Sequence, residues 1–232
     1  MKMMISLVKF LLERKKEIAK MQHLETQEIV KDIYVIKTKD ANFYVIKDDG
    51  GYIAIDAGGG NKRIAKEELE KLKIAPEEIT AVFLTHTDLD HISALSLFKN
   101  ATIYISKQEE QVIDGSVSRM FGFVKNKLNH DYKAIDSDKE MVFKTIKIKP
   151  ILTPGHTNGS MSYLLDDKYL FVGDALGLKD GQVILFNTLF NMDDEMQKQS
   201  LKQLAGMQGT EYIFTAHYGF SDNYQGAFQN FR

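Results

Sequence analysis

Two histidines and two aspartates lie close together in the segment FLTHTDLDH, which covers residues 83–91. His86, Asp88, Asp90 and His91 bring two imidazoles and two carboxylates within six residues. Because the chain contains no cysteine, a metal ion in this protein must be bound through imidazole and carboxylate groups. A divalent ion bound in this way activates water and polarises the oxygen atom of a substrate. The segment therefore predicts a metal centre.

Three other segments place similar residues at the ends of expected strands. His156 lies in LTPGHTNGS, Asp174 in LFVGDALG and His217 in FTAHYG. A single histidine in such a turn is most often a hydrogen-bonded or surface group. Four histidines at strand ends, accompanied by three aspartates, favour one shared site instead. His23 and His130 have no comparable context, and both are expected at the surface.

Runs of β-branched and aromatic residues predict the strands that position this site. A strand over residues 79–84 leads directly into His86, and open α/β sheets commonly build their sites at such carboxyl ends. Further strands are expected over residues 32–38, 41–48, 51–58, 101–107, 141–153, 160–167, 168–176 and 210–219. Helices are expected over residues 61–74, 90–98 and 192–206, the first with Asn61 as its cap. This order predicts an α/β fold in which two halves pack sheet on sheet, with helices outside.

The composition of the chain limits its partners and its location. Its 232 residues include 30 lysines and arginines and 32 aspartates and glutamates, a formal net charge of -2. This balance gives no general attraction to nucleic acid or to an anionic membrane. The lack of cysteine excludes disulfides and a cysteine nucleophile, and it agrees with a cytoplasmic location. We therefore expect a cytoplasmic protein with no nucleic-acid partner.

Residues 1–28 are expected to form an N-terminal amphipathic helix, followed by a single domain over residues 29–232. The apolar residues of this helix recur at helical spacing and include Met4, Val8, Leu11, Leu12 and Ile18. The apolar run is interrupted at Lys9, has no cleavage site and is too short to span a bilayer, so stable membrane insertion is not expected. The helix could pack on the domain, pack on a second copy in a homodimer, contact a membrane surface weakly, or be removed by processing.

Taken in order, the four motifs resemble the signature of the metallo-β-lactamase superfamily. That signature is H-x-H-x-D-H, then a distant histidine after a glycine, an aspartate after a strand and a final histidine near the C-terminus. The spacings agree, with 65 residues from His91 to His156, 18 to Asp174 and 43 to His217. The resemblance runs from about residue 30 to the end of the chain. It implies a four-layer αβ/βα sandwich in which two mixed β-sheets face each other and helices cover their outer faces.

The resemblance also implies a role for each motif residue. The first metal ion would be bound by His86, Asp88 and His156, the second by Asp90, His91 and His217, and Asp174 would bridge the two. Asp90 would also be the catalytic residue. Asp56, in the segment IDAG, would orient a ligand imidazole. Asn158, Ser160 and Tyr218 lie near the motif histidines in the sequence and are candidate contacts to substrate.

Asp88 departs from the superfamily's motif, which has a histidine at this position. An aspartate oxygen is bonded to Cγ, as is Nδ1 of histidine, so Asp88 can present a donor atom in nearly the same place. An added carboxylate favours harder ions such as iron(II) or manganese(II), and flavodiiron proteins of this superfamily bind two irons with a glutamate here. The predicted cofactors are two divalent ions, zinc or else iron or manganese. A single ion at Asp90, His91, Asp174 and His217, or a site that binds metal poorly, remains open.

The predicted function is a metal-dependent hydrolase that attacks an ester, thioester, lactone or phosphoester bond of a small molecule with a metal-bound hydroxide. The inserted domain of nucleic-acid-processing members and the C-terminal helices of glyoxalase II have no expected counterpart. The alternative is a non-haem iron oxidoreductase similar to sulfur dioxygenases or to the flavodiiron metal domain. A binding or sensing protein with a degraded site is a third hypothesis.

Substrate specificity is expected to lie in two stretches without a readable motif. One covers residues 108–140, in which Met120, Phe121 and Phe123 could either cover the site or belong to the core. The other is the loop LKDGQVILFNTLFN, residues 178–191.

Overall fold

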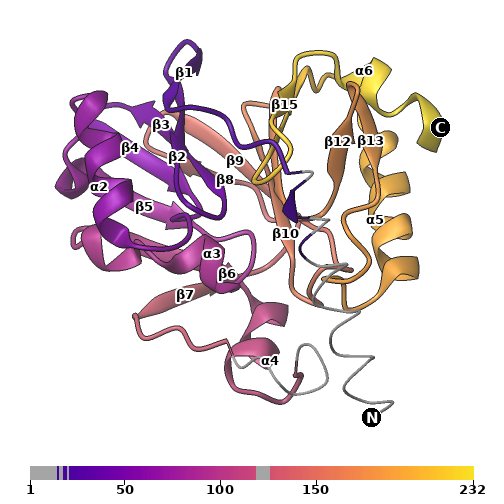
Figure 1. Cartoon of the computed structure of the whole chain (residues 1–232), viewed down its shortest axis with the longest axis horizontal. Coiled ribbons are helices and arrows are strands. Elements are labelled where there is room, and N and C mark those ends of the chain that lie inside the picture. The colour runs from indigo at the N-terminus through magenta and orange to yellow at the C-terminus, as the bar shows by residue number, and fades with distance from the viewer. Residues whose placement is uncertain (1–14, 16–17, 20, 119–125) are drawn as a thin grey trace.

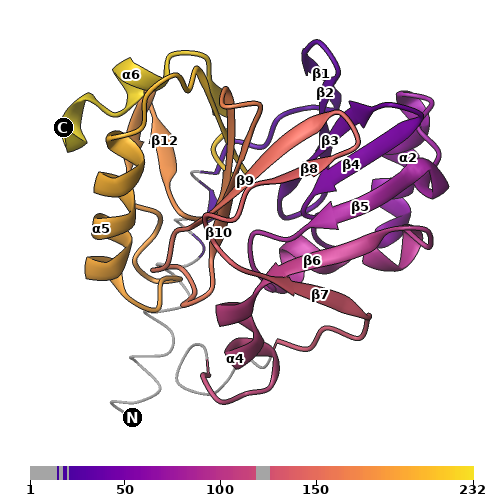
Figure 2. The same cartoon turned by 180° about the vertical axis from the view of Figure 1, so that it is seen from behind.

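Two β-sheets lie face to face in this protein, with helices on the outer side of each (Figure 1). The computed structural model describes residues 15, 18–19, 21–118 and 126–232. Helix α2 (Lys62–Lys71) covers the sheet built by the first half of the chain, and helix α5 (Asp194–Ala205) covers the sheet built by the second half. Figure 2 shows the same order of layers from behind. The chain therefore folds into two α/β halves that meet through their sheets.

The first sheet has seven strands in the order β1-β2-β3-β4-β5-β6-β7, which is also their order along the chain. They are β1 (Gln27–Val30), β2 (Ile33–Lys37), β3 (Asn42–Asp48), β4 (Gly51–Ile55), β5 (Ile79–Phe83), β6 (Thr102–Ser106) and β7 (Tyr132–Ile135). The strands β1 to β4 pair antiparallel, whereas β4 to β7 run parallel to one another. The loops that follow the parallel strands therefore lie along one edge of the sheet.

The second sheet has six strands in the order β15-β14-β11-β10-β9-β8. They are β8 (Met141–Phe143), β9 (Ile146–Leu152), β10 (Met161–Leu165), β11 (Tyr169–Gly173), β14 (Tyr212–Thr215) and β15 (Phe220–Ser221). Only β11 and β14 run parallel. The strands β12 (Gly177–Lys179) and β13 (Gln182–Ile184) form a separate hairpin. Both large sheets are therefore mixed, as predicted.

The two long helices begin at side-chain caps that the sequence supplies. The side chain of Asn61 accepts a hydrogen bond from the Arg63 N–H before α2, and that of Asp193 accepts one from the Met196 N–H before α5, each over 2.9 Å. Such caps satisfy N–H groups that have no partner within the helix. The shorter helical segments are η1 (Pro76–Glu78), α3 (Leu89–Ile92), η2 (Leu95–Leu97), η3 (Lys107–Glu109), α4 (Glu110–Ile113), α6 (Tyr224–Ala227) and η5 (Gln229–Phe231).

Apolar side chains fill three interfaces between the layers. Leu69 of α2 packs on the outer face of the first sheet, and Leu204 of α5 packs on the outer face of the second. Between the sheets, the rings of Phe83 and Tyr163 pack edge to face with centroids 5.5 Å apart. This order of layers, together with the structural comparison reported below, confirms the four-layer αβ/βα sandwich.

The prediction of one helix over residues 90–98 is wrong in its length. Helix α3 ends after one turn, because the N–H groups of Ser93 and Ala94 donate to the carbonyls of Gly58 and Ala57 rather than within a helix. A separate short turn, η2, follows. Contacts with the loop after β4 thus override the local helical pattern, and they hold the start of α3 beside that loop.

The strand expected over residues 141–153 is two strands, β8 and β9, joined by a tight turn. Lys144 has a φ of 52° in that turn, a left-handed conformation that ends a strand. The strands β1, β7, β12, β13 and β15 were not predicted as separate elements. Each has two to four residues, too few for an alternating pattern to be distinct from loop sequence.

The N-terminal helix expected over residues 1–28 does not reach residue 28. Lys15 and Ile18 are helical, but residues 21–25 are not, and Gln27 begins β1. The Gln22 N–H donates to the His217 carbonyl, and Leu24 pairs with the side chain of Asn42, so tertiary hydrogen bonds replace helical ones. Residues 1–14, and also Met120, Phe121 and Phe123, lie outside the described residues. Within the described part of the chain, no helix is both long and apolar enough to cross a membrane.

Candidate metal centre

Four strands end where the motif residues begin. In the first sheet the parallel strands β4 and β5 end just before Asp56 and His86. In the second sheet the parallel strands β11 and β14 end just before Asp174 and His217. His156 lies in the loop between β9 and β10. The site therefore lies where the carboxyl ends of one parallel pair in each sheet meet.

Thr85 and Gly173 bring these two strand ends into direct contact. Gly173 has a φ of +52°, and a Cβ atom added there would lie 2.3 Å from Oγ1 of Thr85. Only glycine fits so close an approach with that backbone conformation. The Met161 N–H also donates to the Thr85 carbonyl over 2.8 Å, so a second strand of the facing sheet is tied to the same residue.

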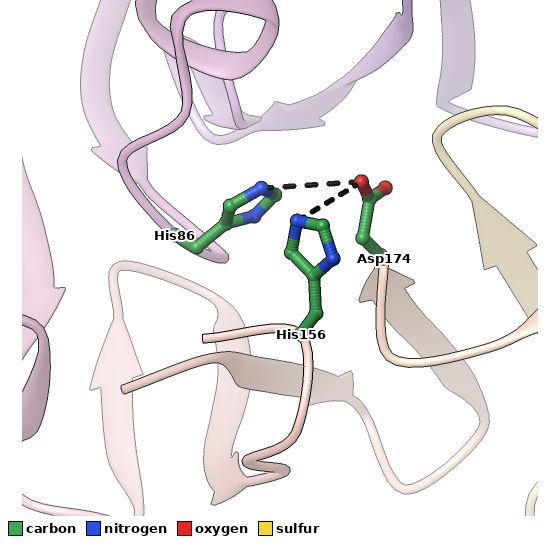
Figure 3. Close-up of side chains that lie close together, drawn as sticks. All are labelled: His86, His156 and Asp174. Atoms are coloured by element: carbon green, nitrogen blue, oxygen red, sulfur yellow. Dashed lines mark ion pairs between the residues drawn. The ribbon is translucent and has the colours of Figure 1, made fainter. Parts of the chain in front are cut away.

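One cluster of donor atoms consists of His86, His156 and Asp174, whose side chains converge in Figure 3. Oδ2 of Asp174 lies 4.0 Å from Nε2 of His86 and 3.5 Å from Nε2 of His156. Asp88 faces the same two nitrogens, with its Oδ2 atom 3.6 Å from His86 and 3.2 Å from His156. All four residues predicted for the first ion are therefore brought together.

A second cluster consists of Asp90, His91 and His217. Nε2 of His217 lies 3.4 Å from Oδ2 of Asp90, and Nε2 of His91 lies 3.9 Å from the same oxygen. The other oxygen of Asp174, Oδ1, lies 3.5 Å from His91 Nε2 and 3.3 Å from His217 Nε2. Asp174 thus faces both clusters, with one carboxylate oxygen toward each.

The donor atoms have the burial and the chemistry that divalent ions require. Nε2 of His86, Nε2 of His91 and Oδ1 of Asp174 are buried, yet none makes a hydrogen bond within the described residues. Buried polar atoms are nearly always satisfied, and the exceptions point to an ion or to a functional constraint. Four imidazoles and three carboxylates form a nitrogen and oxygen donor set that suits zinc, iron or manganese. The residues present therefore fit two divalent ions.

The pKa values of the metal-free site differ between the two clusters. Burial and the neighbouring His91 lower the pKa of His86 to about 4. Burial opposes protonation of His217 too, but the charges of Asp174 and Asp90 outweigh it and raise its pKa to about 9. Burial also lowers the pKa of His91, but the three carboxylates that face this ring outweigh it and raise the pKa well above the ordinary value. A metal ion would therefore displace protons from the second cluster, whereas His86 already presents a neutral nitrogen.

Asp56 lies behind the second cluster, where it was expected to orient a ligand. Its Oδ2 atom lies 2.8 Å from Nδ1 of His91, so Nε2 of that ring points toward the site. Its Oδ1 atom accepts the Thr85 N–H over 2.7 Å, and Oγ1 of Thr85 lies 3.0 Å from Nδ1 of His86. Asp56 thus orients the imidazole of His91 directly and that of His86 through Thr85. Contacts of this type strengthen metal binding.

A cavity of about 540 Å³ opens beside both clusters. The residues that line it include Asp88, Asp90, His156, Asp174 and His217 from the clusters, and Ile18, Met21, Leu89, Phe186 and Phe190 from the surrounding apolar wall. The ring of Phe186 is 5.0 Å from that of His156 and 5.8 Å from that of His217, between centroids. The predicted loop of residues 178–191 therefore contributes to the site through its two phenylalanines.

The three candidate substrate contacts do not line this cavity. The Ser160 hydroxyl accepts a hydrogen bond from the Thr157 N–H over 3.0 Å, so it shapes the turn after His156. The Tyr218 N–H donates to Oγ1 of Thr215, and its ring packs on Phe186. Asn158 lies in the same turn as Ser160 and outside the cavity lining. These three residues were predicted because they lie near the motif histidines in the sequence, but the structure places them in turns and not in the cavity lining.

Three residues near the site were missed or misplaced by the sequence. His23 was expected at the surface, but it is half-buried, lines the cavity and has its Nε2 atom 3.4 Å from Nδ1 of His217. Asn126 donates to Asp88, and Glu109 hydrogen-bonds to the loops of the first cluster. The partners are far apart in the sequence: 194 positions for the contact of His23, 38 for that of Asn126, and 22 and 48 for those of Glu109. No local sequence pattern therefore marks these contacts.

The fold and the paired donor clusters are those of a metal-binding αβ/βα protein, and comparison with known sequences identifies the family. The model of the metallo-beta-lactamase superfamily matches residues 37–217, a range that contains all seven candidate ligands. The chain belongs to this superfamily. A crystal structure of a metallo-beta-lactamase family protein from Thermus thermophilus has a TM-score of 0.67 and covers 88% of this chain and 79% of its own, at 16% identity. At that identity the likeness concerns the fold alone.

Two curated relatives are similar to part of the chain. A probable metallo-hydrolase of Methanocaldococcus jannaschii is 34% identical over 151 residues, which cover 65% of this chain and 63% of that protein. The hydroxyacylglutathione hydrolase of Bartonella tribocorum is 29% identical over 138 residues, which cover 59% of this chain and 47% of that enzyme. The similarity thus spans less than two thirds of the length of either relative.

Proposed function

We propose that this protein is a metal-dependent hydrolase that cleaves an ester, thioester, lactone or phosphoester bond of a small molecule. The main support is the position of Asp174, whose two carboxylate oxygens face two separate histidine pairs at the wall of a cavity. When bound, two divalent ions lower the pKa of a water molecule to about 7 and polarise the oxygen of the bond under attack. No nucleophilic side chain of the protein is needed for such a reaction.

The protein's own residues orient the donors and exclude water. Asp56 fixes the ring of His91, and Thr85 contacts the ring of His86, so both Nε2 atoms face the ligand position. Phe186 is only 2% exposed and packs against His156, which keeps water from the far side of that ring. Asp90, a candidate ligand whose side chain is 33% exposed and lines the cavity, is placed to take a proton from the attacking water and pass it to the leaving group.

The cavity favours a substrate with an apolar part. Among the lining residues that the structure describes, Lys39 is the only lysine or arginine, and its chain neighbour Asp40 offsets its charge. The two proposed ions could bind a phosphoryl oxygen as well as a carbonyl oxygen, so the preference depends on the cavity wall, where Phe186, Phe190, Ile18 and Met21 offer apolar surface. We therefore rank ester, thioester and lactone substrates above phosphoesters. The thioester hydrolases among the similar proteins support the same ranking.

Metal content and hydrolysis together test the proposal. The purified protein should contain zinc, iron or manganese by elemental analysis, and it should hydrolyse members of a panel of acyl thioesters, aryl esters, lactones and phosphoesters. Activity should disappear after chelation, return with added metal and be absent in Asp174→Asn. Asp48→Asn is the matched control, because Asp48 is a buried carboxylate at the opposite end of the first sheet. A protein with no bound metal, or a metal-loaded protein that hydrolyses no substrate of the four classes, would contradict the proposal.

A non-haem iron oxidoreductase is the second candidate, and one observation favours it. The carboxylate of Asp88 faces His86 and His156 where the superfamily motif has a histidine, and carboxylate ligands favour iron or manganese over zinc. Iron in the purified protein, with oxygen consumption in the presence of a thiol or persulfide and no ester hydrolysis, would support this candidate. A cytoplasmic location and a homodimer remain predictions.

A further inference from the structure

Glu109 is a buried carboxylate outside the two donor clusters. It ends η3, directly after β6, and is 1% exposed. Its Oε1 atom accepts hydrogen bonds from the N–H of Thr87 over 2.8 Å and from the hydroxyl of Thr87 over 2.7 Å. Its Oε2 atom accepts a hydrogen bond from the hydroxyl of Thr157 over 2.6 Å. The two oxygens therefore bind two different loops.

Each of these threonines is adjacent to ligands of the first cluster. Thr87 lies between His86 and Asp88, and Thr157 follows His156. The bond to the Thr87 N–H fixes the peptide that links Thr87 to His86, and the bond to Thr157 fixes the residue after His156. One carboxylate thus joins the two loops that supply three of the four donors of this cluster.

The segment around Glu109 is packed tightly against the second of these loops. The Ser106 hydroxyl donates to the carbonyl of Gly159 over 2.6 Å and accepts the Glu109 N–H over 3.1 Å. A Cβ atom added at Gly159 would lie 2.2 Å from the backbone nitrogen of Glu109. Because the backbones touch, Glu109 has little freedom to move relative to the loop that follows His156.

A buried carboxylate is costly to retain unless its hydrogen bonds serve a purpose. The described residues provide no lysine or arginine partner for Glu109, and its bonds are to hydroxyl and amide donors. Loss of solvation is unfavourable for such a charge and is only partly offset by hydrogen bonds. Residues of similar volume without charge would fill the space at lower cost, so packing alone does not explain a glutamate here.

We propose that Glu109 is a positioning residue for the first metal ion, a role that rests on the proposed metal-dependent function. It fixes the distance between the loop of His86 and Asp88 and the loop of His156, so that their donor atoms converge before an ion binds. The second cluster is oriented by other groups, Asp56 at His91 and His23 at His217. Loss of Glu109 therefore affects one ion and not the other.

Zinc titration of the metal-free protein, by chelator competition and elemental analysis, tests this role. The wild type should bind two zinc ions per chain. Glu109→Ala should still bind one with unchanged affinity, and the other about 10- to 100-fold more weakly, the usual effect of removing a group that orients ligands. Glu109→Gln should restore most of the affinity, because its amide oxygen can still accept both bonds from Thr87 while Thr157 reorients its hydroxyl.

Asp48→Ala is the matched control. Asp48 is a buried carboxylate that accepts hydrogen bonds from Thr145 far from the site, so its loss should lower stability without changing either zinc affinity. If Glu109→Ala does not fold, Thr157→Val removes one of the three bonds at constant volume, and the first zinc should then bind several-fold more weakly.

Three outcomes are decisive against the role. Two zinc ions bound to Glu109→Ala with wild-type affinities would exclude it. Equal weakening of both ions, together with a lowered melting temperature, would show that Glu109 supports only the fold. A wild-type chain that binds no zinc, iron or manganese would instead overturn the proposed function and the positioning role with it.

Discussion

The side-chain amide of Asn126 donates a hydrogen bond to Oδ1 of Asp88 over 2.7 Å, while Oδ2 of the same carboxylate lies 3.2 Å from Nε2 of His156. One oxygen is therefore occupied, and the other faces the first cluster. This arrangement gives a carboxylate at position 88 a fixed orientation. It supports the hypothesis that Asp88 is a ligand in its own right rather than the remnant of a histidine.

Replacement of Asn126 should weaken the first ion. Asn126→Ala removes the donor to Oδ1, so the Asp88 carboxylate can rotate, and we expect an approximately tenfold loss of affinity for one of two zinc ions. Asn100→Ala is the control, because the side chain of Asn100 lies at an exposed position and donates to the Glu77 carbonyl. Chelator competition measures both variants, and an unchanged first affinity in Asn126→Ala would show that the hydrogen bond does not orient the ligand.

Replacement of Asp88 by histidine should change which metal the protein prefers. An imidazole in place of a carboxylate makes the first cluster softer and favours zinc over manganese or iron(II). We expect Asp88→His to shift the zinc-to-manganese affinity ratio toward zinc by about tenfold or more. Competition between the two ions, followed by elemental analysis, gives the ratio. The same ratio in both proteins would mean that Asp88 is not a ligand.

The stability of the metal-free protein should depend on pH through the second cluster. His217 has a pKa of about 9 in the folded metal-free protein, above its ordinary value of 6.5. Its protonated form therefore stabilises the fold fully below about pH 6.5, and this stabilisation is lost as the pH rises through about 9. The melting temperature of the metal-free protein should fall by on the order of 5 °C across that interval. A flat profile would contradict the shifted pKa.

Zinc binding should show the opposite dependence on pH. An ion at the second cluster must displace the protons of His91 and His217, whereas His86, whose pKa is about 4, has none to lose at neutral pH. Titration calorimetry at pH 7.5 in two buffers of different ionisation enthalpy should therefore detect about two protons released per chain. Release of no protons would indicate that zinc does not bind to the second cluster.

His23 should matter to the second ion even though no motif marks it. Its Nε2 atom lies 3.4 Å from Nδ1 of His217, so it can accept the proton of that ring and keep Nε2 of His217 directed at the site. His23→Ala should weaken one zinc ion by about tenfold, and His130→Ala, the matched histidine outside the cavity lining, should not. Equal affinities in all three proteins would show that the contact has no effect on binding.

That the candidate ligands lie close together could be predicted because they lie at the ends of strands. His86, Asp174 and His217 each follow a short apolar run that ends in a turn, so residue type and local pattern agree. Asp56 follows β4 in the same way, and its contact with His91 follows from the parallel pairing of β4 with β5. The sandwich could be predicted because the same apolar runs mark its strands.

Residues that act through long-range contacts could not be predicted. Glu109 follows a strand like many surface glutamates, and only the fold brings it to Thr157. His23 belongs to a segment whose apolar spacing predicts a continuous helix. The backbone of this segment instead donates a hydrogen bond, from the Gln22 N–H, to the carbonyl of His217. Helix α3 shows the same limit, since its end is set by the carbonyls of Ala57 and Gly58 rather than by its own residues.

The contact between Thr85 and Gly173 has a consequence for how the protein unfolds. The first cluster takes His86 and Asp88 from the first half of the chain and His156 and Asp174 from the second, and the second cluster is divided in the same way. Each bound ion would thus cross-link the two halves of the chain at the interface between their sheets. Separation of the halves would release both ions at once, so the metal content of the protein would report whether its two halves are docked.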